Sequence, residues 1–191
     1  MARSNSIRII GGDFRGRRLR FPDVAGLRPT ADRIRETLFN WLQGRIEGSR
    51  CLDLFTGSGA LGMEALSRGA DRVWFVDLSR QVNKQLHQNL QLLDAEAHAK
   101  VITADGLKML RSPPDKRFHI VFLDPPFAKD CLAEACQLLE DNDWLEKQSW
   151  IYLEQDSQRQ WEPLPDNWQL YREAKAGQAA CHLYRRGIIS G

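Results

Sequence analysis

The sequence has few of the features that mark membrane, secreted or metal-stabilised proteins. Its 191 residues include only four cysteines, with no Cys-x-x-Cys pair and no histidine at ligand spacing, so neither a disulfide scaffold nor a zinc ribbon is expected. The longest strongly apolar stretches, such as residues 120–123, are far shorter than the roughly 20 residues that span a bilayer. The first residues form no apolar secretion signal. We therefore expect a cytoplasmic protein with reduced cysteines, no membrane contact and no metal.

Lysine is absent from residues 1–50, although arginine is abundant there. This segment has eleven arginines against five acidic residues, whereas the rest of the chain is mildly acidic and the net charge is only +2. Arginine makes bidentate contacts with phosphate that lysine cannot make. The charge alone fits two interpretations, a solvated arginine-rich surface or a contact with a polyanion such as nucleic acid.

Internal repeats and low-complexity segments are also missing, and the pattern from residue 50 onward alternates between strands and helices. Near-continuous apolar strands separated by helices predict an α/β Rossmann-like fold, a seven-stranded, mostly parallel sheet covered on both faces. Two closing strands around Gly177 predict an antiparallel C-terminal hairpin. We expect strands at 51–55, 73–76, 100–102, 118–123, 150–153, 169–173 and 180–184, and helices at 57–68, 80–93, 107–110 and 132–139.

The N-terminal segment has a different pattern. Short alternating runs at 7–10 and 17–21 predict a small β-hairpin, and a helix is expected to follow Thr30 as its N-cap. We therefore divide the chain into an arginine-rich extension, residues 1–29, and a main domain, residues 30–191. Four arginines lie along the predicted hairpin: Arg15, Arg17, Arg18 and Arg20.

A glycine-rich turn follows the first strand of the main domain. Gly57, Gly59 and Gly62 satisfy G-x-G-x-x-G, and Asp77 ends the next strand 20 residues after Gly57. Such glycines let the backbone approach a ligand at a helix N-terminus, and an acid at the end of the second strand can accept hydrogen bonds from a ribose diol. Asp53 just before the turn would repel a pyrophosphate but attract an amino group, which argues against NAD.

A second motif, Asp124-Pro125-Pro126-Phe127, follows the strand at 118–123, at the end where open α/β sheets bind ligands. Prolines have no N–H, so the free groups of this turn are acceptors. The Asp124 carboxylate and the Pro125 carbonyl could both accept hydrogen bonds from one exocyclic amine, and Phe127 offers a face for stacking a flipped base.

Together, the two motifs resemble those of class I S-adenosylmethionine-dependent methyltransferases that act on exocyclic amines. Three longer stretches, 8–17, 27–40 and 57–66, resemble the small-subunit (16S) ribosomal RNA guanine-N2 methyltransferases, and the resemblance extends from about Ile7 to Tyr184. It implies methyl transfer from S-adenosylmethionine to N2 of a guanine, position 966 in 16S numbering, on the small ribosomal subunit or an assembly intermediate. We expect the enzyme to act as a monomer.

The resemblance also implies roles for individual residues. In this family the glycine turn holds the methionine part of the cofactor, the acid after strand two binds the ribose, and the acid after strand three faces the adenine beside a side chain at the Leu78 position. The proline motif carries the target base. The stretch from Thr30 to Arg35 helps to close the cofactor pocket, with the division of Thr30, Arg33 and Arg35 between cofactor and RNA left open. The implied cofactor residues are Asp53, Thr56, Gly57, Ser58, Gly59, Asp77, Leu78, Asp105, Gly106 and Thr30; the implied base-site residues are Asp124, Pro125, Pro126 and Phe127; and the candidate RNA contacts are Arg15, Arg17, Arg18, Arg20, Arg33 and Arg35.

Other functions explain less of the sequence. A DNA adenine-N6 methyltransferase shares the acid-Pro-Pro-aromatic logic but usually needs a recognition domain for which this chain has no room. A protein glutamine methyltransferase normally has Asn in place of Asp124. An NAD-dependent dehydrogenase leaves the proline motif unexplained, and a non-catalytic RNA-binding module leaves the cofactor motif unexplained.

Overall fold

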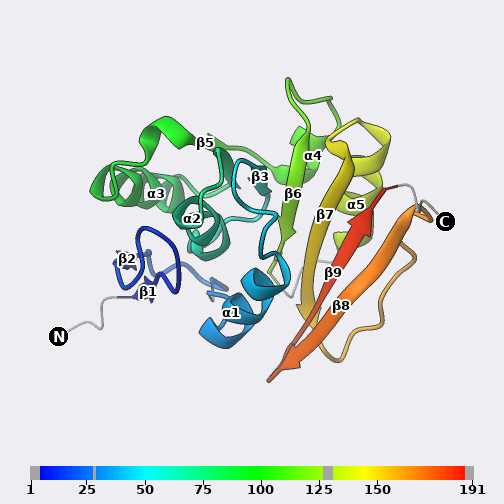
Figure 1. The fold of residues 1–191 in the computed structure, drawn as a ribbon, viewed down its shortest axis with the longest axis horizontal. Coiled ribbons are helices and arrows are strands. Elements are labelled where there is room, and N and C mark those ends of the chain that lie inside the picture. The colour runs from blue at the N-terminus through cyan, green and yellow to red at the C-terminus, as the bar shows by residue number, and fades with distance from the viewer. Residues whose placement is uncertain (1–4, 28, 127–130, 188–191) are drawn as a thin grey trace.

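The computed structural model describes residues 5–27, 29–126 and 131–187, and it confirms the predicted fold class. A seven-stranded sheet runs in the order β5-β4-β3-β6-β7-β9-β8, with parallel pairing from β5 to β7 and antiparallel pairing of β7 with β9 and of β9 with β8 (Figure 1). The strands are β3 (Arg50–Asp53), β4 (Arg72–Asp77), β5 (Ala99–Thr103), β6 (Phe118–Leu123), β7 (Leu145–Asp156), β8 (Trp168–Ala176) and β9 (Ala179–Arg186).

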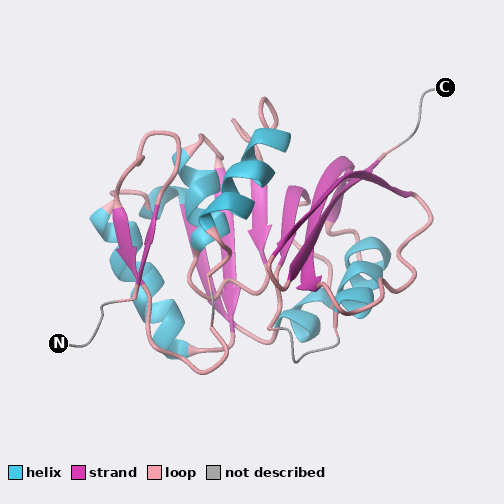
Figure 2. Ribbon diagram, turned by 90° about the horizontal axis from the view of Figure 1, so that it is seen from below, coloured by secondary structure: helices cyan, strands magenta, loops and turns pink. Residues whose placement is uncertain are grey.

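Helices flank both faces of this sheet (Figure 2). Strands β3 and β6 are buried on both sides because they lie in its centre. Residues of each strand therefore belong to two different hydrophobic clusters. In one cluster, Phe122 of β6 packs on Phe39 of α1 with ring centroids 5.9 Å apart. In the other cluster, Phe118 of β6 stacks on Trp144. The helices are α1 (Asp32–Trp41), α2 (Ala60–Ser67), α3 (Arg80–Leu92), α4 (Gly106–Leu110) and α5 (Leu132–Asp141), with a 3-10 turn at Glu96–His98.

The arginine-rich N-terminal segment forms the predicted hairpin, with β1 (Ser6–Arg8) antiparallel to β2 (Arg18–Arg20). It lies beside α2 and α3, away from the β8–β9 end of the molecule (Figure 1). Ile7, Ile9 and Leu19 are buried in the same cluster as the residues of α1, α2 and α3. The hairpin is thus packed on the main domain through a shared core.

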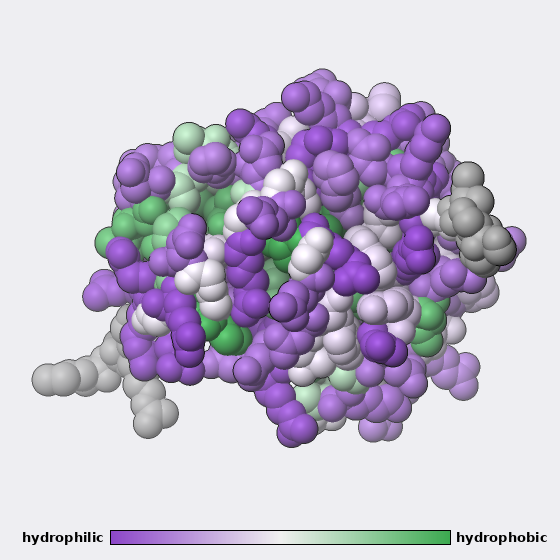
Figure 3. All heavy atoms as spheres, in the orientation of Figure 1, coloured by the Kyte–Doolittle hydropathy of each residue, from purple (hydrophilic) through white to green (hydrophobic). Residues whose placement is uncertain are grey.

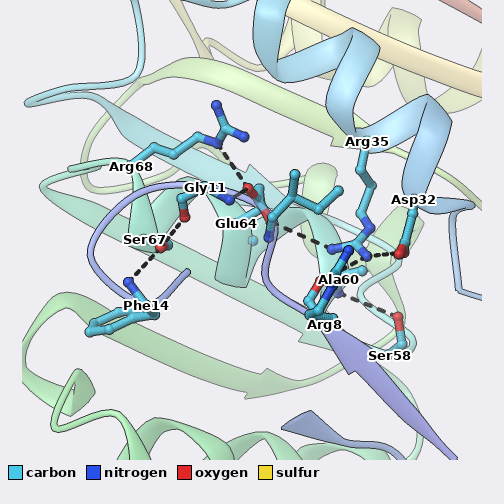
Figure 4. A network of polar contacts seen from close by, with 12 residues as sticks. Arg8, Gly11, Phe14, Asp32, Arg35, Ser58, Ala60, Glu64, Ser67 and Arg68 are labelled. Atoms are coloured by element: carbon cyan, nitrogen blue, oxygen red, sulfur yellow. Dashed lines mark hydrogen bonds and ion pairs between the residues drawn. The ribbon is translucent and has the colours of Figure 1, made fainter. Parts of the chain in front are cut away.

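One buried carboxylate fixes this docking. Glu64 of α2 accepts hydrogen bonds from the backbone N–H groups of Ile10 and Gly11 at 2.9 and 2.8 Å. It also accepts from the guanidinium groups of Arg68 and Arg35 (Figure 4). Arg35 of α1 in turn donates to the Arg8 carbonyl at 3.0 Å. The hairpin, α1 and α2 therefore meet at the Glu64 carboxylate, whose negative charge is balanced by the two guanidinium groups. A buried ion requires such partners.

Three local expectations need correction. Thr30 is not the N-cap of α1, because Ala31 holds that position and makes no side-chain cap. Helix α2 begins only at Ala60, after the glycine turn. Strand β7 begins at Leu145, five residues before the expected start, because the β6–β7 pairing contains a register shift that accommodates the extra residues.

Other sequence expectations can be compared directly with the structure. The four cysteines are free and buried, as expected for packed thiols. Within the described ranges, no helix is both long and apolar enough to cross a membrane. On the face drawn in Figure 3, hydrophobic residues form small patches among hydrophilic ones.

Candidate active site

A cavity of about 730 Å³ lies at the carboxyl ends of the parallel strands. We divide it into two parts. The glycine-turn half is formed by the turn after β3, the end of β4 and the loop after β5, and its acids are Asp53, Asp77 and Asp105. The proline-turn half is formed by the turn after β6, the end of β7, the residue before α1 and the β8–β9 turn, and its acids are Asp124 and Glu154. The fold thus brings the two predicted motifs into one cavity.

Gly57 and Gly59 determine the backbone conformation of the glycine-turn half, although they do not themselves line the cavity. Gly57 adopts φ +53° and donates its N–H to Asp77 Oδ2 at 3.0 Å. Gly59 precedes α2 with φ +78°, and a Cβ there would lie 2.6 Å from Leu86 of α3. Only glycine fits both the conformation and the close approach. Thr56 and Ser58 reach the cavity from the same turn, with the Thr56 hydroxyl anchored to the Asp53 carbonyl at 2.8 Å.

Two acids of this half are oriented by backbone N–H groups. Besides Gly57, Asp77 accepts a hydrogen bond from the Ser79 N–H at 2.8 Å. Asp105 caps α4, accepting from the N–H groups of Leu107 and Lys108. Each carboxylate oxygen has a second lone pair, so both acids keep acceptor capacity toward the cavity. Leu78 lines the same cavity and is 63% exposed, so it offers an apolar surface to a flat ligand.

Asp53 is the buried acid of the glycine-turn half. Its Oδ2 accepts the Gly62 N–H at 3.0 Å, and burial raises the pKa of Asp53 to about 8. In the described part of the chain, no lysine or arginine is bonded to this carboxyl group. A ligand that carries an ammonium group would therefore supply the missing countercharge.

In the proline-turn half, Asp124 is held by a residue from the other end of the domain. Its Oδ2 accepts the Thr30 hydroxyl at 2.9 Å, across 94 residues of sequence. Loss of hydration, together with the neighbouring Glu154 carboxyl, raises the pKa of Asp124 well above its usual range. Pro125 and Pro126 also line the cavity. Phe127, predicted to stack on the base, lies outside the described residues.

The proline-turn half also contains residues that the sequence analysis did not identify. Glu154, at the end of β7, is buried and lines the cavity beside Asp124. Its Oε2 accepts the Tyr152 hydroxyl at 2.7 Å. Gln178 and Ala179 of the β8–β9 turn complete the wall. Glu154 belongs to no recognisable motif, so only the register of β7 beside β6 could have indicated it.

The predicted RNA-binding arginines differ in exposure. Arg15, Arg18, Arg20 and Arg33 are exposed, as is Arg17, whose guanidinium also donates to the Leu92 carbonyl. Arg35 is fully buried and bonded to Glu64, Asp32 and the Arg8 carbonyl. In this structure Arg35 therefore has no exposed surface with which to contact RNA. Its buried partner Glu64 explains why the Arg35 side chain faces inward.

The hydrogen-bond acceptors, charged groups and apolar wall of the cavity match the chemical groups of S-adenosylmethionine. Asp77 offers acceptors for a ribose diol, Asp105 and Leu78 offer an acceptor and an apolar wall for an adenine, and Asp53 offers a countercharge for the amino group of a methionine. The fold and this arrangement together define a class I methyltransferase.

The chain belongs to the family described as conserved hypothetical protein 95, whose model matches residues 7–185. It is 48% identical over 183 residues to the ribosomal RNA small subunit methyltransferase D of Escherichia coli K12, covering 96% of this chain and 91% of that protein. The protein of the same name from Haemophilus influenzae is 45% identical, covering 94% and 93%. The solved structure of yhhF from Escherichia coli superposes with a TM-score of 0.89 at 45% identity, covering 96% of this chain and 99% of that one.

Proposed function

We propose that this enzyme transfers a methyl group from S-adenosylmethionine to the exocyclic N2 of a guanine in small-subunit ribosomal RNA, guanine 966 in 16S numbering, and that it acts in the cytoplasm. The single observation that carries this proposal is the contact between Thr30 and Asp124, which fixes an acceptor for an amine inside a cavity suited to a nucleoside cofactor. The names of the relatives with 48% and 45% identity support ribosomal RNA as the substrate.

The glycine-turn half would hold the cofactor. We assign the ribose to Asp77, the adenine to the wall formed by Asp105, Gly106 and Leu78, and the methionine part to Asp53 and the turn from Thr56 to Gly59. When bound, the cofactor supplies an electrophilic methyl group on a positively charged sulfur. The enzyme's own contribution is to hold the amine in line with that methyl group, which lowers the barrier mainly through positioning.

The proline-turn half would hold the amine. The lone pair of guanine N2 is delocalised into the ring, so the amine is a poor nucleophile. Hydrogen bonds from its two N–H groups to the Asp124 carboxylate and the Pro125 carbonyl would direct the lone pair toward the methyl group. The raised pKa of Asp124 makes its carboxylate a better base, able to accept the proton that the nitrogen loses after methylation.

The hairpin β1–β2 would bind the RNA backbone. Arg8 lies directly opposite Arg18 in the hairpin, and Ser6 lies opposite Arg20, so three arginines share the outward face while Ile7 and Leu19 point inward. Like charges directly opposite each other are unfavourable, and a bound phosphate would relieve the repulsion. Among the described residues, Arg8, Arg15, Arg18 and Arg20 have no acidic side-chain partner.

The first experiment measures methyl transfer from labelled S-adenosylmethionine to small ribosomal subunits that lack the modification, followed by nucleoside analysis. We expect labelled N2-methylguanosine. Label on adenine N6, transfer to DNA alone, or transfer only to a protein amide would overturn the substrate assignment.

A second experiment tests the hairpin. Replacing Arg18 and Arg20 with Gln should weaken binding to the subunit RNA and reduce the slope of log affinity against log salt by about one for each phosphate that the variant no longer binds. The matched control replaces Arg117 and Lys147 with Gln, two exposed cations outside the hairpin. Equal salt slopes for the two double variants would exclude the hairpin as the phosphate-binding surface.

A further inference from the structure

Asp124 and Glu154 lie side by side at the ends of neighbouring strands. Leu123 of β6 is paired with Leu153 of β7, and each acid follows directly after its leucine. Parallel strands are about 4.8 Å apart, and alternate residues share a face. Because Phe122 and Tyr152 belong to the cluster on the α1 side, the side chains of Asp124 and Glu154 lie on that side as well. The proline-turn half therefore presents two adjacent carboxyl groups.

Glu154 is buried without a countercharge. Only 5% of its surface is exposed, and its described hydrogen-bond partner is the Tyr152 hydroxyl, which donates to Oε2. No described lysine or arginine forms an ion pair with it. Burying a carboxyl group in this way is costly unless a further donor reaches it. Glu154 lines the cavity that is proposed to hold the target base, so a bound base could supply such a donor.

We infer that Glu154 accepts the N1–H of the target guanine while Asp124 accepts from the neighbouring N2 amine, and that this pair selects guanine over adenine. The inference rests on the proposed function and extends it to the choice of base. On the Watson–Crick edge of guanine, N1–H and the N2 amine are adjacent donors, which two adjacent acceptors match. Adenine presents N1 as an acceptor next to its amine, so a carboxylate at that position would face another acceptor. Enzymes that flip a base read it through hydrogen bonds to this edge.

The Tyr152 hydroxyl explains how Glu154 is oriented for this task. Tyr152 lies two residues earlier on the same face of β7, and its hydroxyl fixes one carboxyl oxygen at 2.7 Å. The second oxygen then has a defined direction for a single donor. Tyr152 is thus a positioning residue that acts through Glu154.

The test compares two target bases that have the same amine. Small subunits are reconstituted with RNA that carries either guanine or 2-aminopurine at the methylated position; 2-aminopurine retains the exocyclic amine but has no hydrogen on N1. Because a buried acceptor left unpaired costs about 1–3 kcal/mol, we expect the wild-type enzyme to prefer guanine by roughly 10–100-fold in kcat/KM. The variant Glu154→Gln should lose most of this preference, because its amide can donate to the bare N1. The control Glu173→Gln changes an exposed acid on β8 and should keep the wild-type preference.

Each outcome decides the inference. A wild-type enzyme that methylates both bases equally well would overturn it without any variant, as would a Glu154→Gln enzyme with the wild-type preference. Binding of S-adenosylhomocysteine, measured by calorimetry, checks that the variant is folded. If it is not, Tyr152→Phe provides the second test, and it should reduce the preference partially. Failure of the proposed function looks different, because the wild-type enzyme would then form no N2-methylguanosine at all.

Discussion

The two halves of the cavity hold their acids in different ways. In the glycine-turn half, Asp77 and Asp105 each accept two backbone N–H groups, and Asp53 accepts one. In the proline-turn half, Asp124 and Glu154 are held by side-chain hydroxyls, those of Thr30 and Tyr152. Backbone donors are fixed by the fold itself, whereas a hydroxyl donor depends on the orientation of its side chain and, for Thr30, on how a segment 94 residues away packs.

This difference matches two kinds of work. Binding a cofactor requires acceptors that are fixed in position, and backbone N–H groups hold the Asp77 and Asp105 carboxyl groups in this way. Under the proposed function, Asp124 must also take up the proton that the amine loses, and loss of hydration raises the pKa of this carboxyl group. Four substitutions test the division, beginning with the largest expected effect.

The substitution Asp124→Ala should distinguish the functions of the two halves most clearly. It removes the proposed acceptor for the amine and for its proton, so methyl transfer should fall by about 10³-fold or more. Binding of S-adenosylhomocysteine, measured by calorimetry, should stay within about threefold of the wild type, because the glycine-turn half is untouched. Asp115→Ala, at an exposed loop position, is the control. Loss of cofactor binding in Asp124→Ala would contradict the division.

The substitution Asp77→Ala should produce the opposite result. It removes the proposed acceptor for the ribose diol and the partner of the Gly57 and Ser79 N–H groups. We expect the affinity for S-adenosylhomocysteine to fall about 10–100-fold, since hydrogen bonds to charged groups contribute about 1.5–3 kcal/mol. Asp71→Ala, at an exposed position before β4, should bind normally. Unchanged affinity would remove Asp77 from the cofactor site.

The substitution Thr30→Val tests the hydroxyl on Asp124. The Thr30 hydrogen bond lowers the pKa of Asp124, so its removal should raise that pKa further. The ascending limb of the pH–rate profile, which under the proposed function follows ionisation of Asp124, should then move to higher pH, and the rate at a pH on that limb should fall about tenfold if the pKa rises by about one. Thr37→Val, inside α1, should leave the profile in place. A lower rate without a displaced profile would mean that Thr30 acts through cofactor binding.

The substitution Asp53→Asn tests the buried acid through stability. The pKa of Asp53 is raised from 3.8 to about 8, so between these values the folded protein without cofactor keeps a proton that the unfolded chain has lost. The free energy of unfolding should therefore decrease by up to about 1.4 kcal/mol per pH unit as the pH rises through this window. Asp53→Asn should remove that part of the slope in urea denaturation between pH 5 and 7. Identical slopes would show that Asp53 is ionised in the folded protein.

The site residues that could be predicted from the sequence are those whose role depends on the local backbone conformation. Gly57 and Gly59 are needed for positive φ angles, and Asp77 and Asp105 are placed by strand ends, so short motifs reveal them. The contact of Thr30 with Asp124 was not predictable, because it joins segments 94 residues apart through the packing of α1 on β6. Glu154 was missed because its place depends on the β6–β7 register.

The exposure of a charged residue is equally hard to predict from the sequence, as Arg35 shows. An arginine in an arginine-rich segment is expected to be exposed, since burial of its charge requires a partner. That partner, Glu64, lies in α2, 29 residues later, and its role is evident only once α1, α2 and the hairpin are assembled.

The position of Glu64 in the chain has a consequence for synthesis. The hairpin, with Arg15, Arg18 and Arg20, leaves the ribosome before α2, and the Glu64 carboxylate that accepts the Gly11 N–H follows Gly11 by 53 residues. Until then the nascent hairpin lacks the contacts that hold its arginines in one arrangement. A growing chain therefore completes the proposed RNA-binding surface only after α2 has been synthesised.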